Sequence, residues 1–213
     1  MCYSENVSLF TFIVGVMGSF LCYKKDDPNY KIIGVFFGFV ILMQLLEYLL
    51  WKHQNCDTYN KSLSVIAMLI NHLQPVVLFL AIVLINKKLI YKKEMIIMLF
   101  VYLCFVIPYS IQFLRGDLCT IKGEGNHLSW TWNKLSYASL VYIVFLISFI
   151  VFGMLGFPNK SQGILFSIIS VFSFLISFII YNNVHSVGSM WCFFAAFTPI
   201  FYIILLFLNT KVV

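Results

Sequence analysis

Two ionisable side chains stand inside long apolar stretches of this sequence, Glu47 in the second stretch and His72 in the third. An ionisable group at membrane depth is energetically costly, so such a residue normally has a partner or a function. A carboxylate in hydrocarbon must be protonated, paired or hydrated. Glu47 and His72 are therefore the first candidates for chemistry in this chain.

Further polar residues accompany both groups at helical spacing. Gln44 precedes Glu47 by three residues, which places both side chains on one face of a helix. In the third stretch, polar residues directly precede Pro75, which frees a backbone carbonyl about one turn earlier. Ser189 and Cys192 open the last stretch on one side. The candidate ligand-binding residues are Gln44, Glu47, Asn71, His72, Gln74, Ser189 and Cys192.

The second and third stretches are consecutive, antiparallel helices, so their polar side chains can meet across one interface. A contact between Glu47 and His72 would offset the cost of burying both groups. Two interpretations stay open: the cluster fixes the register of the helices, or it is a site for a small ligand, an ion or a proton.

A second hypothesis is an intramembrane hydrolase with a metal ion near the outer leaflet. Its available ligands are His72, His127, His185, Glu47 and Glu5. Ceramidase-like seven-span hydrolases, which this set resembles, also use histidines on late spans, and the last apolar stretch here has none. We therefore favour transport or sensing over catalysis, and the sequence specifies no cofactor.

The cysteines suggest a bridge between two loops. Cys56 and Cys119 fall in loops on the predicted outer side, where disulfides form. Cys2 also lies outside and competes for either partner. Cys22 and Cys104 fall in apolar stretches and are expected to be buried thiols.

The composition predicts the elements that must position these residues. Of 213 residues, 62% are hydrophobic and 10% are charged, with a mean hydropathy of +0.95. A helix needs about 20 mostly apolar residues to cross a bilayer, so we expect an all-α bundle of seven transmembrane helices that forms a single domain over residues 1–213. The predicted spans are 7–23, 32–51, 62–85, 94–114, 135–157, 163–181 and 188–208.

The basic residues predict the orientation. Lys24 and Lys25 follow the first span and none precedes it, which is the reverse of a cleavable signal peptide. Because cytoplasmic loops are rich in Lys and Arg, the N-terminus is expected outside and the C-terminus in the cytosol. The inner segments then hold Lys24, Lys25, Lys31, Lys87, Lys88, Lys92, Lys93, Lys160 and Lys211, and the outer ones Lys52, Lys61, Arg115, Lys122 and Lys134.

The same charges exclude two classes of protein. The net charge of +6 is spread over the gaps between spans and forms no basic stripe, which argues against nucleic acid. No lysine falls within a span, so a retinal Schiff base is excluded. A sugar-transporter arrangement of two parallel three-helix repeats joined by a fourth span stays open, since Pro75 and Pro199 fall in corresponding helices.

Aromatic and small residues suggest how the bundle is anchored and packed. Trp and Tyr residues near the predicted outer boundary are expected to form an interfacial belt: Trp51, Tyr59, Trp130, Trp132, Tyr137, Tyr181 and Trp191. Residues 119–133 are expected to fold back over the outer face. Close helix packing is expected at Gly34 and Gly38, and at Gly15 and Ser19.

Several motifs in fixed order resemble a family of seven-span membrane proteins of bacteria, algae and giant viruses whose members begin Met-Cys-Trp/Tyr-Ser. The matching residues are Met1 to Ser4, Met43 to Tyr48, Cys56, Asn60, His72, Gln74, Pro75, Cys119, Gly123, His127, Trp130 and Trp191 to Phe193. The resemblance spans nearly the whole chain and implies a fold but no particular reaction. With the bias toward Lys, Ile, Asn and Phe, it suggests a viral or protist source and a host or virion membrane.

The function expected from the sequence is transport or sensing of a small ligand or ion through the polar cluster of the second, third and seventh spans. The expected partners are the lipid bilayer and that ligand, and the sequence does not specify an oligomeric state.

Overall fold

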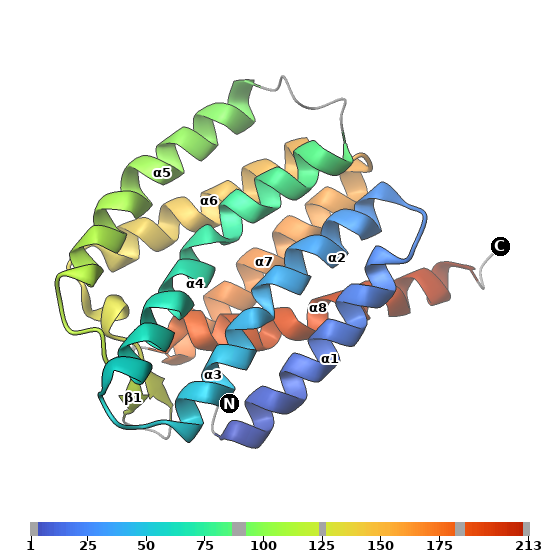
Figure 1. Ribbon diagram of the computed structural model, residues 1–213. Coiled ribbons are helices and arrows are strands. Elements are labelled where there is room, and N and C mark those ends of the chain that lie inside the picture. Colours follow the sequence, from blue (N-terminus) through green and yellow to red (C-terminus); the bar gives the residue numbers. More distant parts are fainter. Residues whose placement is uncertain (1–3, 87–92, 124–126, 182–185, 211–213) are drawn as a thin grey trace.

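The computed structural model describes residues 4–86, 93–123, 127–181 and 186–210, without the side chains of residues 206 and 208–210. Within these residues, seven helical segments are long and apolar enough to cross a membrane (Figure 1). The chain is therefore an all-α, multi-pass membrane protein, and the seven predicted spans are confirmed.

The helices begin and end within a few residues of the predicted limits, except that the second span consists of two helices. The elements are α1 (Glu5–Tyr23), α2 (Pro28–Val40), α3 (Leu42–Lys52), α4 (Thr58–Ile85), α5 (Lys93–Leu114), β1 (Ile121–Lys122), β2 (Leu128–Ser129), the 3₁₀ helix η3 (Thr131–Lys134), α6 (Ala138–Gly156), α7 (Lys160–Tyr181) and α8 (Val187–Thr210).

Polar caps define where several spans start. The side chains of Ser4, Asp27 and Asp57 accept hydrogen bonds from backbone N–H groups in the first turns of α1, α2 and α4. Such caps satisfy donors that have no partner within the helix. Pro28 occupies the first position of α2, where its missing N–H costs no hydrogen bond because an N–H at this position has no partner within the helix.

The second span is interrupted at Ile41, between α2 and α3. The Gln44 N–H donates at 2.9 Å to the carbonyl of Ile41, three residues earlier. This is the hydrogen bond of a 3₁₀ turn, which is wound more tightly than an α-helix. The Ile41 side chain lies over Gly15 of α1, where a Cβ atom would be 2.4 Å from Ile41 Cδ1. The chain at Ile41 therefore packs on a glycine of α1, and it directly precedes the polar residues of α3.

Small residues bring neighbouring helices together. A Cβ atom on Gly34 would lie 2.7 Å from the Ser19 carbonyl oxygen, and one on Gly163 would lie 2.1 Å from that of Gly153. The packing predicted for Gly34 and Ser19 is confirmed. The second contact joins α6 to α7 in the same way.

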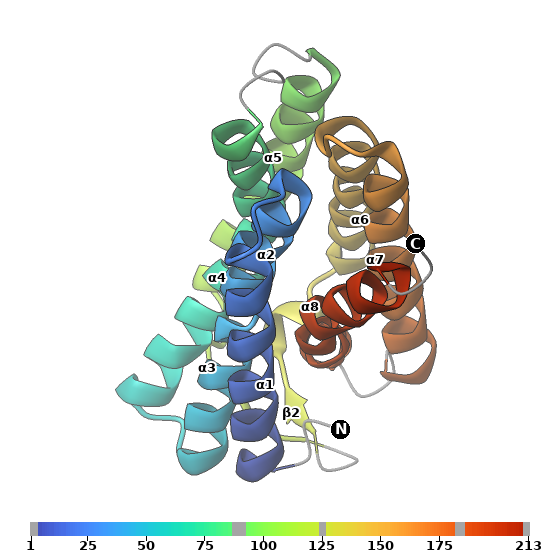
Figure 2. The same cartoon turned by 90° about the vertical axis from the view of Figure 1, so that its right-hand side faces the viewer.

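The spans form a ring in which neighbours along the chain are neighbours in space, and α1 closes it against α8. Figure 2 shows α1 to α5 on one side of the bundle and α6 to α8 on the other. Direct contacts of α4 with α6 and of α2 with α8 link the two sides.

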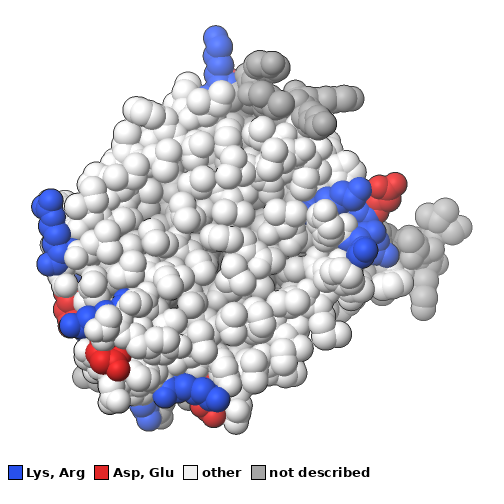
Figure 3. Space-filling view, viewed as in Figure 1, with Lys and Arg blue, Asp and Glu red and all other residues white. Residues whose placement is uncertain are grey.

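Charged side chains gather near the ends of the helices. In Figure 3 they leave a broad uncharged band between them, as expected of a surface that faces lipid. We call the end that carries Cys56 and Cys119 the disulfide end, and the opposite end, which carries Lys24 and Lys25, the lysine end.

The predicted aromatic belt is wrong for three tryptophans, because they point into the bundle. Trp130, Trp132 and Trp191 are at most 1% exposed. The first two rings pack together with centroids 4.4 Å apart. Trp191 donates its indole N–H to the Ser173 hydroxyl of α7. At the disulfide end, Tyr137 is 65% exposed and suits the interface.

Candidate functional site

A group of polar side chains lies inside the ring, between α1, α3, α4 and α8. We call it the inner polar cluster. It consists of Thr11, Gln44, Glu47, Gln74 and Cys192, each fully buried. Four of these five residues were singled out from the sequence.

Short contacts connect the members across helices. The Thr11 hydroxyl lies 2.8 Å from Gln44 Oε1 and also close to carbonyls of its own helix. The Gln74 amide donates to Cys192 Sγ at 3.6 Å. Glu47 follows Gln44 by three residues on the same face of α3 and is buried with it. The two side-chain contacts between helices therefore join α1 to α3, and α4 to α8.

Two buried carbonyl oxygens on α4 have no hydrogen-bond partner among the described residues. They are Oε1 of Gln74 and Oδ1 of Asn71, whose side chains are at most 1% exposed. A buried acceptor without a donor costs on the order of 1–3 kcal/mol. Both atoms are available to a group that donates hydrogen bonds.

Asn71 belongs to a second polar group nearer the disulfide end. Its amide donates to the Tyr142 hydroxyl of α6 at 3.5 Å, and that hydroxyl donates to Asn133 Oδ1 at 2.6 Å. Gly188, near the start of α8, lies against both side chains, since a Cβ there would be 3.3 Å from the Tyr142 oxygen. Ser189 is buried beside it, as a residue of the same turn.

His72 points away from the inner polar cluster. Its Nδ1 lies 2.8 Å from the Ser110 hydroxyl of α5, and its ring packs on Tyr109 at 5.3 Å between centroids. The Tyr102 hydroxyl donates to the His72 carbonyl at 2.6 Å. The expected meeting of His72 with Glu47 is therefore not what the structure shows, because the imidazole is directed to α5.

The described residues contain no group of three or more His, Cys, Asp or Glu side chains that could hold a metal ion. His72, His127 and Glu47 are not brought together as a ligand set, and His185 lies outside the described residues. His127 is 5% exposed, and burial lowers its pKa to about 4. Its ring packs on Tyr181 with centroids 5.2 Å apart.

Comparison with protein-family models, curated proteins and solved structures finds no match to this chain.

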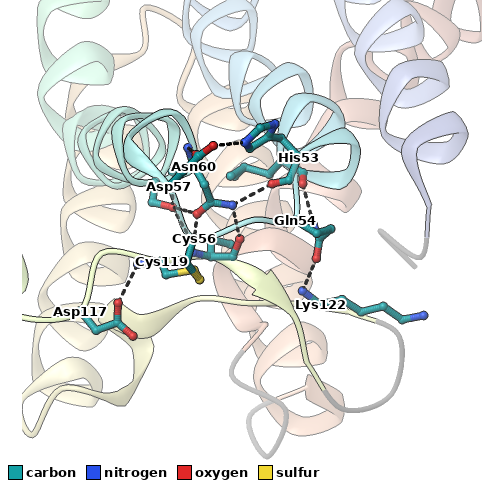
Figure 4. Close-up of a disulfide and its surroundings, with 11 residues drawn as sticks. His53, Gln54, Cys56, Asp57, Asn60, Asp117, Cys119 and Lys122 are labelled. Atoms are coloured by element: carbon teal, nitrogen blue, oxygen red, sulfur yellow. Dashed lines mark hydrogen bonds and ion pairs between the residues drawn. A yellow bond between two sulfur atoms is a disulfide. The ribbon is translucent and has the colours of Figure 1, made fainter.

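The predicted disulfide between Cys56 and Cys119 is confirmed, with Cα atoms 5.4 Å apart. Figure 4 shows how Asn60 reinforces it. The Asn60 amide donates to the carbonyls of His53 and Thr120 at 2.8 Å, and its Oδ1 accepts from the Thr120 N–H at 3.0 Å. The segment before α6 is thereby tied to the loop between α3 and α4. Cys2, the predicted competitor, lies outside the described residues.

The remainder of the segment before α6 covers the disulfide end of the bundle. Leu128, Trp130 and Trp132 are buried. The Tyr109 hydroxyl donates to the Trp132 carbonyl, and the Ser186 hydroxyl donates to that of Leu128. The segment therefore packs against the ends of the helices and covers the two polar groups on the side of the disulfide end.

Sequence reasoning missed Thr11 and Tyr142. In α1, the buried residues Ser8, Thr11, Gly15, Ser19 and Cys22 recur every three or four positions, which marks the inward face. That spacing could have identified Thr11. Tyr142 is one of several aromatic residues in a uniformly apolar helix, and no sequence signal distinguishes it.

Proposed function

We propose that the protein transports or senses a small cation or amine that binds at the inner polar cluster. The observation that carries this proposal is the full burial of Gln74, whose Oε1 has no hydrogen-bond partner among the described residues, in a bundle that also buries the Glu47 side chain. Carboxylate and amide oxygens accept hydrogen bonds, so the preferred ligand is a donor with a positive charge.

The location of the cluster supports the same function. Ligand sites of helical transporters lie within the bilayer at interrupted helices. Here the interruption at Ile41 precedes Gln44 and Glu47 directly, and Pro75 follows Gln74 in α4. The break and the proline are places where these helices can change direction during a transport or signalling step.

Thermal unfolding of the purified protein with a panel of compounds tests the proposal. The panel contains ammonium, small protonated amines, alkali cations and neutral polyols. A ligand at about 100 times its dissociation constant stabilises a protein by about 2.7 kcal/mol. We expect a cation or amine to raise the melting temperature of the wild type, and Glu47→Gln and Gln74→Leu to remove this effect.

Ser148→Ala is the matched control, because Ser148 is equally buried and its hydroxyl donates only to the Val144 carbonyl of its own helix. It should retain the response. An identical response in the wild type and Glu47→Gln would contradict the proposal. Uptake of the stabilising compound into proteoliposomes then distinguishes transport from sensing.

We also propose that the N-terminus lies outside, that the chain belongs to the Met-Cys-Trp/Tyr-Ser family, and that its membrane is that of a virus or its host. The disulfide supports the orientation, because disulfides persist in oxidising compartments. A disulfide end that faces outward places the N-terminus outside and Lys24 and Lys25 in the cytosol.

A further inference from the structure

A groove of about 330 Å³ runs along the outside of the ring between α5 and α6. Its lining includes Cys104, Phe105 and Pro108 from α5, and Tyr137 and Leu140 from the start of α6. Pro108 lies inside α5, where it removes a backbone hydrogen bond and favours a bend. The apolar lining and the position on a lipid-facing surface make hydrocarbon the expected filling.

The groove extends over most of one leaflet. From Cys104 to Gln112, which also lines it, α5 advances eight residues, or about 12 Å at 1.5 Å per residue. Half of a hydrocarbon core is about 15 Å thick. The groove therefore reaches from near the middle of the bilayer to the headgroups at the disulfide end.

Polar residues line the end of the groove nearest the headgroups, and basic residues lie close to them along the chain. Gln112 and Tyr137 line it there. Arg115 follows Gln112 by three residues on the same helix end, and Lys134 precedes Tyr137 in η3; both basic side chains are exposed. The nearby acid Asp117 accepts a hydrogen bond from the Cys119 N–H. Amide and phenol groups thus line this end of the groove, and a guanidinium and an ammonium group lie three residues from them along the chain, a combination that suits a phosphate.

We propose that this groove binds a phospholipid of the leaflet at the disulfide end. One acyl chain lies along Phe105, Pro108 and Leu140, and the phosphate meets Arg115 at the end near Gln112. The site is independent of the inner polar cluster, because it opens outward and shares no residue with it.

A second groove lies between α6 and α7. It is larger, about 510 Å³, and its lining includes Ile150, Met154, Ile168 and Phe172. The polar side chain in it is Ser167, whose hydroxyl donates to the Gly163 carbonyl of its own helix. Acyl chains can occupy this surface too, and the exposed Lys160 precedes its lining residue Ile164 by about one turn of α7. It is an internal comparison for the α5–α6 groove.

Photocrosslinking tests the proposal. The full-length protein is reconstituted in phosphatidylcholine vesicles with a trace of phospholipid that carries a diazirine in the middle of one acyl chain, and the modified peptides are mapped. We expect modification to concentrate on residues 104–112 and 137–141. Leu140→Trp, which fills the groove, and Arg115→Gln, which removes the cation, should each lower this modification by about fivefold.

Ile147→Trp is the matched control. Ile147 lies on α6 about two turns beyond Leu140, with the same exposed fraction of 43%, and does not line the groove. It should leave the modification unchanged. If Leu140→Trp does not fold, Arg115→Gln tests the proposal by itself, because Arg115 is exposed at the end of a helix and its substitution should leave folding unchanged.

Two results would overturn the proposal. Equal modification of the α5–α6 and α6–α7 grooves, insensitive to Arg115→Gln, would show ordinary annular lipid. Crosslinks from the groove to a second copy of the chain would show that a protomer covers it.

Discussion

Burial alone does not decide which polar residues act together in this bundle. Asn71, His72 and Gln74 are all buried on α4, yet they face different neighbours. Successive residues of a helix are rotated by about 100°, so Asn71 and Gln74 share one side while His72 turns toward α5. The rotation explains why Gln74 meets Cys192 and His72 meets Ser110.

The contact between Thr11 and Gln44 is expected to stabilise the bundle measurably. Thr11→Val keeps the shape of the side chain and removes the hydroxyl that lies 2.8 Å from Gln44 Oε1. Hydrogen bonds between helices in membranes contribute about 0.6 kcal/mol on average and up to about 1.7. We expect the free energy of unfolding in mixed micelles to fall by about 1 kcal/mol. A double-mutant cycle with Gln44→Leu should give a coupling of similar size, and additive effects would show that the contact contributes nothing.

His127 predicts a dependence of stability on pH. Burial lowers its pKa in the folded protein to about 4, below the ordinary value of about 6.5. The unfolded chain therefore binds the proton more readily, and the free energy of unfolding should fall as the pH decreases from about 6.5 to 4. The loss is on the order of 1–3 kcal/mol at pH 4.

Melting temperatures between pH 4 and 8, for the wild type and for His127→Asn, measure this effect. The variant should show a smaller loss on acidification. Parallel curves for the two proteins would assign the pH dependence to other groups.

At the scale of single residues, the sequence was most informative where burial of a polar group is costly. Gln44, Glu47, Gln74 and Cys192 were expected to lie near one another; all four are buried, and Gln74 contacts Cys192. Ser189 is buried next to Gly188, which lies against Asn71 and Tyr142. Thr11 was missed because a threonine hydroxyl in a helix can bond to its own backbone, as it also does here.

The helices are positioned by small residues and by interruptions. Gly15 accommodates Ile41 at the break between α2 and α3, and Gly153 and Gly163 bring α6 and α7 into backbone contact. The break at Ile41 contains neither proline nor glycine. Hydropathy therefore predicted one continuous second span; residues Pro28–Lys52 form it, and the irregularity is confined to Ile41, whose backbone stays in the right-handed helical region.

Gly163→Ala tests the contact between α6 and α7. A Cβ at this position would lie 2.1 Å from the Gly153 carbonyl oxygen, which belongs to the backbone and cannot rotate away. We expect a loss of about 1–3 kcal/mol in the free energy of unfolding. Gly116→Ala is the control, because its Cβ would lie at an ordinary 3.5 Å from the nearest atom. Equal losses in the two variants would show that α6 and α7 have room to separate.

For the whole molecule, the charges and the disulfide jointly predict which end faces outward. Cys22 and Cys192 are buried, whereas Cys104 is an exposed free thiol. In a background with Cys2→Ser and Cys104→Ser, Lys134→Cys at the disulfide end should react with a membrane-impermeant maleimide on intact cells. Lys160→Cys at the lysine end should react only after the cells are permeabilised. The opposite pattern would show that the disulfide end faces the cytosol. As a control of exposure, both thiols should react in detergent.

The number of spans, their approximate limits and the disulfide were determined by the sequence alone. Hydropathy determines the spans, because apolar segments of about 20 residues have no other stable environment than the bilayer. The bridge followed from two cysteines in loops on the same predicted side.

The order of helices in the ring and the direction of each side chain were decided by tertiary structure. All spans are apolar nearly all round, so hydropathy does not distinguish the face that meets lipid from the face that meets a helix. Trp130, Trp132 and Trp191 face the bundle, and His72 faces α5, because the rotation of each helix is set by small residues and polar contacts with its neighbours.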